Sequence, residues 1–172
     1  KSKIRINQKN QIMSDFEREI EKTLDKEREQ EVIKRHSKGY RTARENLEDL
    51  VDVDSFVEYG QLAVAAQRER LNADELKLKS AADGVLTGLA TINSGQYGEK
   101  ASQVAVIIND YTVMAGTQGF FHHKKIDRLI EIARKSELPV VMYTEGGGGR
   151  PGDIDVKTQI AGLDVSTFSS WE

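Results

Sequence analysis

The sequence predicts an α/β fold in which helices cover both faces of a β-sheet. Two runs rich in β-branched residues, at 84–92 and 103–110, are typical of strands, and a turn-rich segment separates them. A helix with apolar residues three and four apart follows, and a further apolar run, PVVMYT, begins at Pro139. Strands that are apolar along their length and alternate with helices favour a sheet that is buried on both faces.

Residues 1–40 differ from the rest of the chain, because charged residues crowd them and apolar residues form only a narrow stripe. We expect one long helix at roughly 14–37, since Ser14 and Glu17 fit a capping box and Gly39 fits a C-terminal stop. A stripe this narrow is unusual for a helix that faces a core. Two interpretations remain open: a solvated arm or interdomain linker, and a helix that docks another domain or subunit.

The next segment, up to Asp83, predicts a helix, a short strand and a second helix. Thr42 and Glu45 fit another capping box ahead of an apolar helical face. The sequence SFVEYG is typical of a short strand, and the polar stretch QRERLNADELKLKSAAD is expected to be helical. Residues 41–172 are therefore expected to form one subdomain that is distinct from the charged arm.

The composition excludes several classes of protein. The 172 residues suffice for one domain with a core, and a net charge of -3 does not suit a nucleic-acid binder. The absence of cysteine excludes disulfides and thiolate metal sites. No apolar segment approaches the ~20 residues that span a bilayer and no signal peptide is visible, so we expect a cytoplasmic protein without membrane or nucleic-acid partners. A first residue other than methionine and an end at STFSSWE lead us to expect a fragment.

Two glycine-bearing segments follow predicted strands, MAGTQG at 114–119 and EGGGGRPGD at 145–153. Consecutive glycines are costly to order, so a bare backbone at this point needs a reason. In open α/β sheets, ligands lie beyond the carboxyl ends of strands, where glycines expose main-chain N–H groups. The two segments together are therefore a candidate site for one oxyanion.

Three chemical interpretations compete with a flexible surface loop for residues 145–153. A P-loop is excluded, because no Gly-Lys-Ser/Thr closes the run. A dinucleotide fingerprint matches formally at Gly147, Gly149 and Gly152, but Pro151 lies in the phosphate turn and too little chain follows to complete a βαβ unit. The third is an oxyanion hole of main-chain amides, which stabilises enolates and tetrahedral intermediates.

Titratable side chains flank the two segments. His122 and His123 are typical of a surface position or a helix start. We expect no metal there, because no carboxylate lies at metal-ligand spacing on that helix, and no general acid–base role, because neither ring has an orienting partner. Lys124 and Lys125 are commonly solvated, but beside an amide-lined pocket they would bind ligand phosphates. Arg150 either does the same or anchors the loop.

Four stretches carry a resemblance to a known family: RTARENLEDLVDVDSFVEYG, ADGVLTGLATIN, NDYTVMAGTQGFFHHKKIDRLIEIA and LPVVMYTEGGGGRPGD. In this order and spacing, over about 41–165, they resemble the carboxyltransferase component of biotin-dependent acyl-CoA carboxylases. GTQG and EGGGGRPGD look most like the large carboxylases that join biotin carboxylase, biotin carrier and carboxyltransferase in one chain. The resemblance implies a crotonase-like fold, a spiral of β-β-α units, truncated here and preceded by an interdomain helix.

The resemblance implies transfer of a carboxyl group from carboxybiotin to the α-carbon of an acetyl-, propionyl- or longer acyl-CoA. Removal of an α-proton beside a thioester creates an enolate, whose oxyanion needs donors placed in advance. By resemblance, the amides of Gly147 and Gly148 form this catalytic hole. The acyl-CoA contacts implied are Gly116, Thr117, Gly119, Lys125 and Arg150. Gly146 and Pro151 depart from the common family pattern, so the donor pair could shift by one residue.

The resemblance also implies cofactors and partners. Biotin is expected on a partner carrier domain that a biotin carboxylase domain loads, with carboxybiotin supplying both CO2 and the base. The C-terminal half of the carboxyltransferase would supply a second oxyanion hole, and the intact enzyme is expected to be a homo-oligomer. We expect this chain alone not to catalyse carboxylation. The alternatives are a biotin-dependent acyl-CoA decarboxylase subunit, a dinucleotide-binding module and a pure interaction domain.

Overall fold

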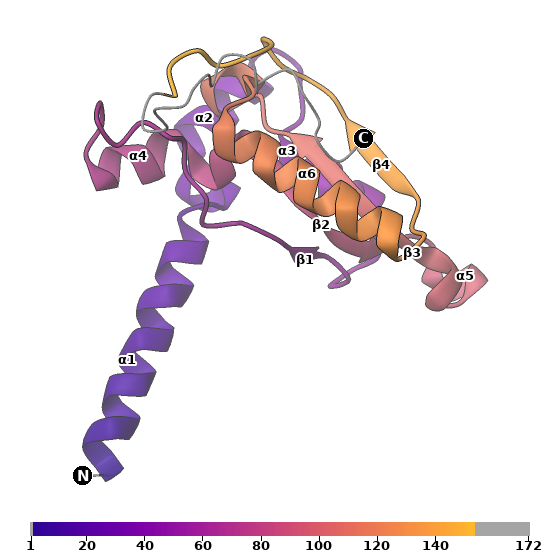
Figure 1. The fold of residues 1–172 in the computed structure, drawn as a ribbon, viewed down its shortest axis with the longest axis horizontal. Coiled ribbons are helices and arrows are strands. Elements are labelled where there is room, and N and C mark those ends of the chain that lie inside the picture. Colours follow the sequence, from indigo (N-terminus) through magenta and orange to yellow (C-terminus); the bar gives the residue numbers. More distant parts are fainter. Residues whose placement is uncertain (1, 154–172) are drawn as a thin grey trace.

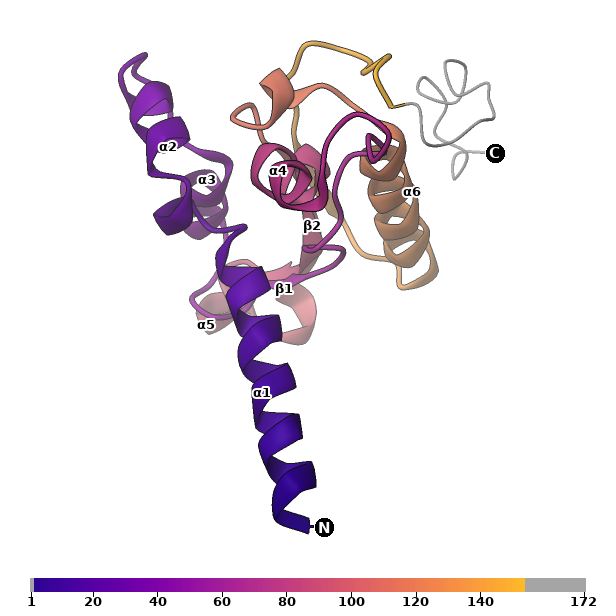
Figure 2. The same cartoon turned by 90° about the vertical axis from the view of Figure 1, so that its left-hand side faces the viewer.

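The structure is a computed structural model that describes residues 2–153, with side chains described from residue 11 onward. These residues form a four-stranded sheet flanked by helices, and a long N-terminal helix that extends away from it (Figure 1). The view in Figure 2 shows the same helix pointing away from the sheet. The predicted α/β class is confirmed, and the last part of the predicted subdomain, 154–172, lies outside the described residues.

The sheet contains each of the strands that the sequence predicts. They are β1 (Val57–Glu58), β2 (Val85–Thr91), β3 (Gln103–Asn109) and β4 (Val140–Tyr143), in this order across the sheet. β1 pairs with β2, and β2 with β3, in antiparallel orientation, whereas β3 and β4 are parallel. The parallel pair is possible because a helix connects its two strands.

The helices largely follow the sequence signals. The α-helices are α1 (Ser2–Glu21), α2 (Glu29–His36), α3 (Ala43–Leu50), α4 (Ala73–Lys79), α5 (Ser94–Tyr97) and α6 (Phe120–Lys135). Short 3₁₀ segments lie at Asp25–Glu27, Ala81–Gly84, Lys100–Ser102 and Met114–Gly116. The capping box at Thr42 and Glu45 is confirmed, with the Thr42 hydroxyl accepting from the Glu45 N–H at 3.1 Å. A second box, between Asn72 and Glu75, opens α4.

Apolar side chains cover both faces of the sheet, as the uninterrupted apolar strands predict. On one face α3 contributes Leu47 to a cluster with Leu86 and Val106. On the other face α6 contributes Leu129 to a cluster with Ile107. Successive residues of β3 point to opposite faces, so one strand supplies both clusters. Each large side chain buried in this way stabilises the fold by about 1.5–3 kcal/mol.

The single helix expected at roughly 14–37 is wrong, because the chain forms two helices, α1 and α2, with a break between them. Ser14 lies inside α1, so its capping-box pattern with Glu17 does not start a helix. After the break, Arg28 reaches Asp110 at 3.1 Å, and both side chains are buried. This long-range ion pair and the turn that permits it outweigh the local helical propensity of a charged segment.

β4, expected to be a buried strand, is a partly exposed edge strand. Among the described residues its only strand partner is β3, and the side chains of Val140 and Tyr143 are 44% and 37% exposed. The apolar composition indicated burial, but burial also requires a neighbour on the outer edge, and none lies within the described residues. The carboxyl ends of the parallel strands β3 and β4 meet at one edge of the sheet, where both glycine segments begin.

Candidate functional site

Two glycine loops meet at the carboxyl ends of β3 and β4. We call residues 110–119 the first glycine loop and residues 144–153 the second glycine loop. The main-chain hydrogen bonds that join them run from Gly147 N–H to the Ala115 carbonyl (3.0 Å), from Gln118 N–H to the Gly148 carbonyl (2.8 Å), and from Arg150 N–H to the Gln118 carbonyl (2.8 Å). The expectation that the two glycine segments lie together is confirmed.

Several glycines are required because the two backbones approach each other closely. A Cβ at Gly116 would lie 2.4 Å from the Glu145 carbonyl oxygen, and one at Gly146 would lie 2.2 Å from the Gly116 oxygen. A Cβ at Gly119 would lie 2.2 Å from a carboxylate oxygen of Asp153. Close-packed backbone cannot relieve such overlaps by small movements. The bare backbone at these positions therefore serves the contact of one loop with the other.

Gly148 is different, because it faces open space. Its φ of +88° lies in the region that favours glycine, yet a Cβ there would meet nothing within 4 Å. Within residues 2–153 no group accepts a hydrogen bond from its N–H, whereas the Gly147 N–H is already bonded to Ala115. Of the two amides that the family resemblance implies as donors, Gly148 is the one that this part of the chain leaves without an internal acceptor.

Arg150 holds the two loops together through its side chain. The guanidinium donates to the Thr117 carbonyl at 2.7 Å and to the Thr117 hydroxyl at 3.3 Å. It also forms an ion pair with Asp83, and both side chains are buried. The sequence left two interpretations open for Arg150, a ligand contact and a loop anchor. The contacts observed within the fold are those of an anchor.

Asp83 lies in a tight turn immediately before β2. The φ angles of Ala82, Asp83 and Gly84 are 51°, 48° and 73°, a left-handed run that strains the two non-glycine residues. The turn directs the Asp83 carboxylate inward, where it accepts from the His122 N–H at 2.7 Å and pairs with Arg150. Burial raises the pKa of the Asp83 carboxyl, and the Arg150 guanidinium opposes that rise.

Asp153 connects the second glycine loop to the start of α6. Its carboxylate accepts from the Phe120 N–H and from the Gln67 side-chain amide, both at 2.9 Å, and lies 3.5 Å from the Arg150 guanidinium. A carboxylate at this position pairs with an N–H that the first helical turn leaves free and interacts favourably with the helix dipole. The second loop is thereby fixed to α6 as well as to the first loop.

His122 and His123 lie at a helix start, as the sequence predicts, but both are buried, so the surface interpretation is wrong. The reason is tertiary: the strained turn lies over the beginning of α6, and the His122 Nδ1 is 3.0 Å from the Asp83 carbonyl oxygen. Burial lowers the pKa of His122 to about 3, so the ring is neutral near pH 7. Its Nε2 has no hydrogen-bond partner among the described residues.

Lys125, which the resemblance assigns to a ligand phosphate, is enclosed within the fold. Its ammonium donates to the Ala82 carbonyl at 2.7 Å and to the Val85 carbonyl. Burial lowers the pKa of this side chain to about 8. The two bonds hold the carbonyl of the first residue of the strained turn and that of the first residue of β2. Within the described fold, Lys125 therefore fixes that turn.

Arg35 of α2 contacts both glycine loops, and no sequence pattern singled it out. Its guanidinium donates to Glu145 in the second loop and lies 5.2 Å from the centre of the Tyr111 ring in the first. In the sequence, Arg35 is one charge among many in a charged segment. The one sequence feature that could have drawn attention to Arg35 is its spacing of two helical turns from Arg28. This spacing places the two arginines on one side of the helix.

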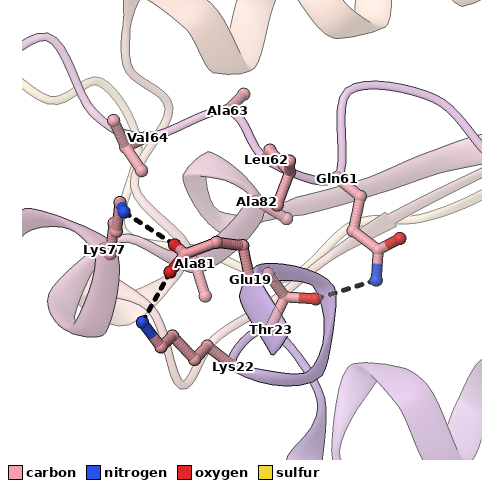
Figure 3. A pocket seen from close by; sticks show the side chains of 10 residues that line it. All are labelled: Glu19, Lys22, Thr23, Gln61, Leu62, Ala63, Val64, Lys77, Ala81 and Ala82. Atoms are coloured by element: carbon pink, nitrogen blue, oxygen red, sulfur yellow. Dashed lines mark hydrogen bonds and ion pairs between the residues drawn. The ribbon is translucent and has the colours of Figure 1, made fainter. Parts of the chain in front are cut away.

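A separate cavity of about 170 Å³ lies between the end of α1, α4 and residues 61–64 (Figure 3). Its lining includes apolar residues of that segment and of the strained turn. At one side the Glu19 carboxylate sits between the ammonium groups of Lys22 and Lys77, at 2.6 Å from each. No lining residue belongs to either glycine loop, so this cavity is not part of the candidate site.

Neither a metal-binding group of side chains nor a membrane-spanning helix is found in the part of the chain that the structure describes. No group of three or more His, Asp or Glu side chains there could hold a metal ion. No helix there combines the length and apolar character needed to cross a bilayer. The charges around the glycine loops instead pair with one another, Asp83 with Arg150 and Glu145 with Arg35.

Comparison with known protein families gives one match that covers most of the chain. The model of the carboxyl transferase domain matches residues 34–163. The matched region begins within α2 and includes the sheet and both glycine loops. Arg35 therefore lies inside the matched region, although it belongs to the charged segment that the sequence separated from the subdomain.

Curated relatives include enzymes that act on acyl-CoA thioesters. The propionyl-CoA carboxylase beta chain of Saccharopolyspora erythraea is 34% identical over 122 residues, which are 71% of this chain and 20% of that protein. The biotin-dependent acetyl-/propionyl-coenzyme A carboxylase beta5 subunit of Mycobacterium tuberculosis is 32% identical over 138 residues, 80% of this chain and 23% of that protein. The chain thus spans about a fifth of the length of these relatives.

Solved structures with a similar fold include an acyl-CoA carboxylase and a transcarboxylase. A single-chain, multi-domain long-chain acyl-CoA carboxylase aligns with a TM-score of 0.84 and 49% identity, over 92% of this chain and 15% of that one. The transcarboxylase 12S hexamer with hydrolysed methylmalonyl-coenzyme A aligns with a TM-score of 0.62 and 31% identity, over 80% of this chain and 24% of that one. The described fold is therefore part of the crotonase-like fold of these enzymes.

Proposed function

We propose that this chain, which belongs to the carboxyl transferase domain family, forms the acyl-CoA side of a carboxyltransferase site in a biotin-dependent acyl-CoA carboxylase. Family membership rests on the match over residues 34–163. The carboxylase class is supported by the relatives and by the neighbour at 49% identity. The proposed reaction moves a carboxyl group from carboxybiotin to the α-carbon of an acetyl-, propionyl- or longer acyl-CoA.

This proposal rests on the amide of Gly148, which has no acceptor within the described residues and lies in one of two loops that are hydrogen-bonded to each other. Loss of the α-proton from a thioester puts negative charge on the thioester oxygen, and a donor held in place beforehand stabilises that charge without reorganisation. Gly148 has no side chain to obstruct the oxygen, and open space lies around it. We assign the first donor of the oxyanion hole to this amide.

The other predicted residues take part in different ways. The Gly147 N–H bonds to the Ala115 carbonyl at 3.0 Å. We therefore propose that Gly147 chiefly holds the second glycine loop against the first, next to Gly148. Gly116, Thr117 and Gly119 form the part of the first loop against which we place the acyl-CoA. The charged groups of Lys125 and Arg150 bond inside the fold, so we propose that both shape the loops and leave the phosphates to other residues.

Among the described residues, the carboxylates of the two loops are ion-paired and the neighbouring histidines are buried. Asp83 is paired with Arg150, and Glu145 is paired with Arg35. His122 is buried against the Asp83 carbonyl. This arrangement fits a reaction in which the base arrives with the second substrate. When bound, carboxybiotin supplies that base together with CO2, and this chain contributes the donor and the shape of the pocket.

The partners follow from the same proposal. Biotin would reach the site on a carrier domain after a biotin carboxylase domain has carboxylated it, and the C-terminal half of the carboxyltransferase would complete the site. The 12S relative is described as a hexamer, which supports a homo-oligomer for the enzyme proposed here. Because the chain spans about a fifth of its relatives, we expect activity only from the complete enzyme.

The test compares two variants of the complete carboxylase. Gly148→Pro removes the donor N–H and also fixes φ at about −65°, away from the +88° of Gly148, whereas Gly148→Ala keeps the N–H and is only strained at this φ. We expect Gly148→Pro to lower kcat by about 10²–10³-fold, and Gly148→Ala to lower it much less. Equal turnover of Gly148→Pro and wild type would refute the assignment. Titration with NAD and with CoA separates the dinucleotide-binding alternative, since binding of NAD without CoA contradicts the proposal.

A decarboxylase is the second candidate, and one relative favours it. The methylmalonyl-CoA decarboxylase subunit alpha of Veillonella parvula is 34% identical over 122 residues, 71% of this chain and 22% of that protein. Both reactions pass through a thioester enolate, so the same amide serves either one. The complete enzyme is assayed in both directions. Release of CO2 from methylmalonyl-CoA without carboxylation of any acyl-CoA would select the decarboxylase.

A further inference from the structure

Arg35 lies where three parts of the molecule meet. Its side chain is 9% exposed and belongs to α2, in the charged N-terminal arm. The guanidinium donates to the Glu145 carboxylate in the second glycine loop. It also lies over two aromatic rings, with centroids 4.8 Å away in Tyr40 and 5.2 Å away in Tyr111 of the first glycine loop. One arginine therefore contacts both loops from outside the sheet.

The orientation of this guanidinium is fixed by further bonds. Its Nε donates to the Arg41 carbonyl at 2.9 Å, which ties it to the turn between α2 and α3. At the other end of α2, Arg28 pairs with Asp110, the first residue of the first glycine loop, at 3.1 Å. An arginine that is bonded through several of its planar donors loses little orientation. α2 is thus anchored on the loop region at both of its ends.

The partner of Arg35 lies at one of the closest contacts between the paired loops. Glu145 immediately precedes Gly146, and its carbonyl oxygen is the atom that a Cβ on Gly116 would meet at 2.4 Å. Only Gly146 and Gly147 separate Glu145 from Gly148, so we expect a shift of Glu145 to displace the Gly148 amide. Misplacement of a donor by about 1 Å costs as much as 10²-fold in rate.

We propose that Arg35 is a positioning residue for the thioester site, which sets the place of the Gly148 amide by holding Glu145 against the first glycine loop. This inference rests on the proposed function, because it assigns Arg35 a part in the same site. It also gives α2 a role in the site. The sequence had allowed two interpretations of the arm that contains α2, a linker and a docking helix.

Kinetics of Arg35→Gln in the complete carboxylase provide the main test. Because the lost alignment matters in the transition state, we expect kcat to fall about 10–100-fold, with KM for acyl-CoA changed less than about twofold. Glu145→Gln should have the same effect, and the double variant should be no worse than either single one, since both break one contact. Unchanged kcat in Arg35→Gln, or multiplicative losses in the double variant, would overturn the proposal.

A matched control separates positioning from general loss of stability. Arg44 pairs with Glu58 at 3.0 Å, with both side chains largely buried, and this pair joins α3 to β1 away from the glycine loops. Arg44→Gln should lower thermal stability at least as much as Arg35→Gln, because both side chains of its pair are largely buried, while kcat per folded site stays unchanged. If Arg35→Gln does not fold, Arg35→Lys keeps the charge and removes the planar fork, and a smaller fall in kcat is expected from it.

Hydrogen exchange tests Arg35 independently of catalysis. In Arg35→Gln we expect the amides that join the two loops, those of Gly147, Gln118 and Arg150, to exchange about fivefold faster or more than in wild type, because the loop is released locally. Unchanged exchange there would contradict the proposal, whatever the kinetics show. If the wild-type enzyme transfers no carboxyl group to any acyl-CoA, the proposed function fails, and the exchange measurement still decides whether Arg35 positions the loop.

Discussion

Arg150 and Arg35 hold the same pair of loops, but their acceptors differ in burial. The Arg150 and Asp83 side chains are 6% and 0% exposed, whereas the Arg35 and Glu145 side chains are 9% and 42% exposed. If Arg150 is lost, Asp83 stays buried without its counterion, but if Arg35 is lost, water reaches Glu145. The Arg150 pair therefore contributes more to the stability of the fold, and the Arg35 pair adjusts the geometry of a loop that is already formed.

The largest effect is expected at the buried pair. Arg150→Met should destabilise the protein by about 3–5 kcal/mol, because it leaves an unpaired carboxylate in the core. Urea unfolding measures the change. As a control, the double variant Asp83→Asn/Arg150→Met should recover part of the loss, since the buried charge is then absent. A loss below about 1 kcal/mol in the single variant would contradict the different roles of the two arginines.

The contact between the loops is the next most sensitive point. Gly116→Ala places a Cβ 2.4 Å from the Glu145 carbonyl at a φ of +65°, so we expect a loss of about 2–3 kcal/mol. Gly148→Ala has a similar φ in open space, and its loss should be about 1 kcal/mol. Denaturant unfolding of both variants measures the difference. Equal losses would mean that the loops are not packed as closely as described.

The pH dependence of stability tests the region of the Arg150–Asp83 pair and not the Arg35 pair, because His122 bonds to Asp83. The folded-state pKa of His122, about 3, is below its ordinary value of 6.5, so the unfolded chain takes up the proton first. This contribution to stability is present above pH 6.5 and is lost as pH falls towards about 3, by about 1.4 kcal/mol per pH unit.

Urea unfolding of wild type and His122→Gln between pH 6.5 and 5 measures this loss. Wild type should lose about 2 kcal/mol more than the variant over that interval, because the variant lacks the titrating ring. Parallel pH profiles for the two proteins would show that His122 is not buried as a neutral ring.

The smallest change in stability is expected at the exposed pair. Arg35→Gln should cost about 1 kcal/mol or less, since solvent screens the half-exposed Glu145. Thermal unfolding of Arg35→Gln and of Arg150→Met under the same conditions gives the comparison directly. A cost as large as that of Arg150→Met would mean that both arginines are equally structural, and the division between them would be lost.

Much of the sheet could be predicted from the sequence, because strand and helix periodicity are local. The apolar runs of β2 and β3 and the helical face of α6 depend on neighbouring residues alone. The position of both glycine loops at the carboxyl ends of strands followed from the same pattern. The choice of Gly147 and Gly148 as donors came from a family resemblance and not from the pattern itself.

The remaining features depend on contacts between distant residues. The break between α1 and α2 is stabilised by Arg28 and Asp110, which are 82 residues apart. Two histidines beside two lysines indicated a solvated helix start, but the strained turn covers His122, and no local signal marks that turn. Arg35 acquires its partner only when the arm folds back over the loops.

The donor role of Gly148 is tested most directly by removing one N–H without altering the backbone path. Replacement of Gly148 by glycolic acid in the complete carboxylase exchanges the amide N–H for an ester oxygen. We predict a fall in kcat of about 10²–10³-fold with little change in KM for acyl-CoA, and a smaller fall for the same replacement at Gly147. An unchanged kcat at position 148 would contradict the assignment of this amide to the thioester oxygen.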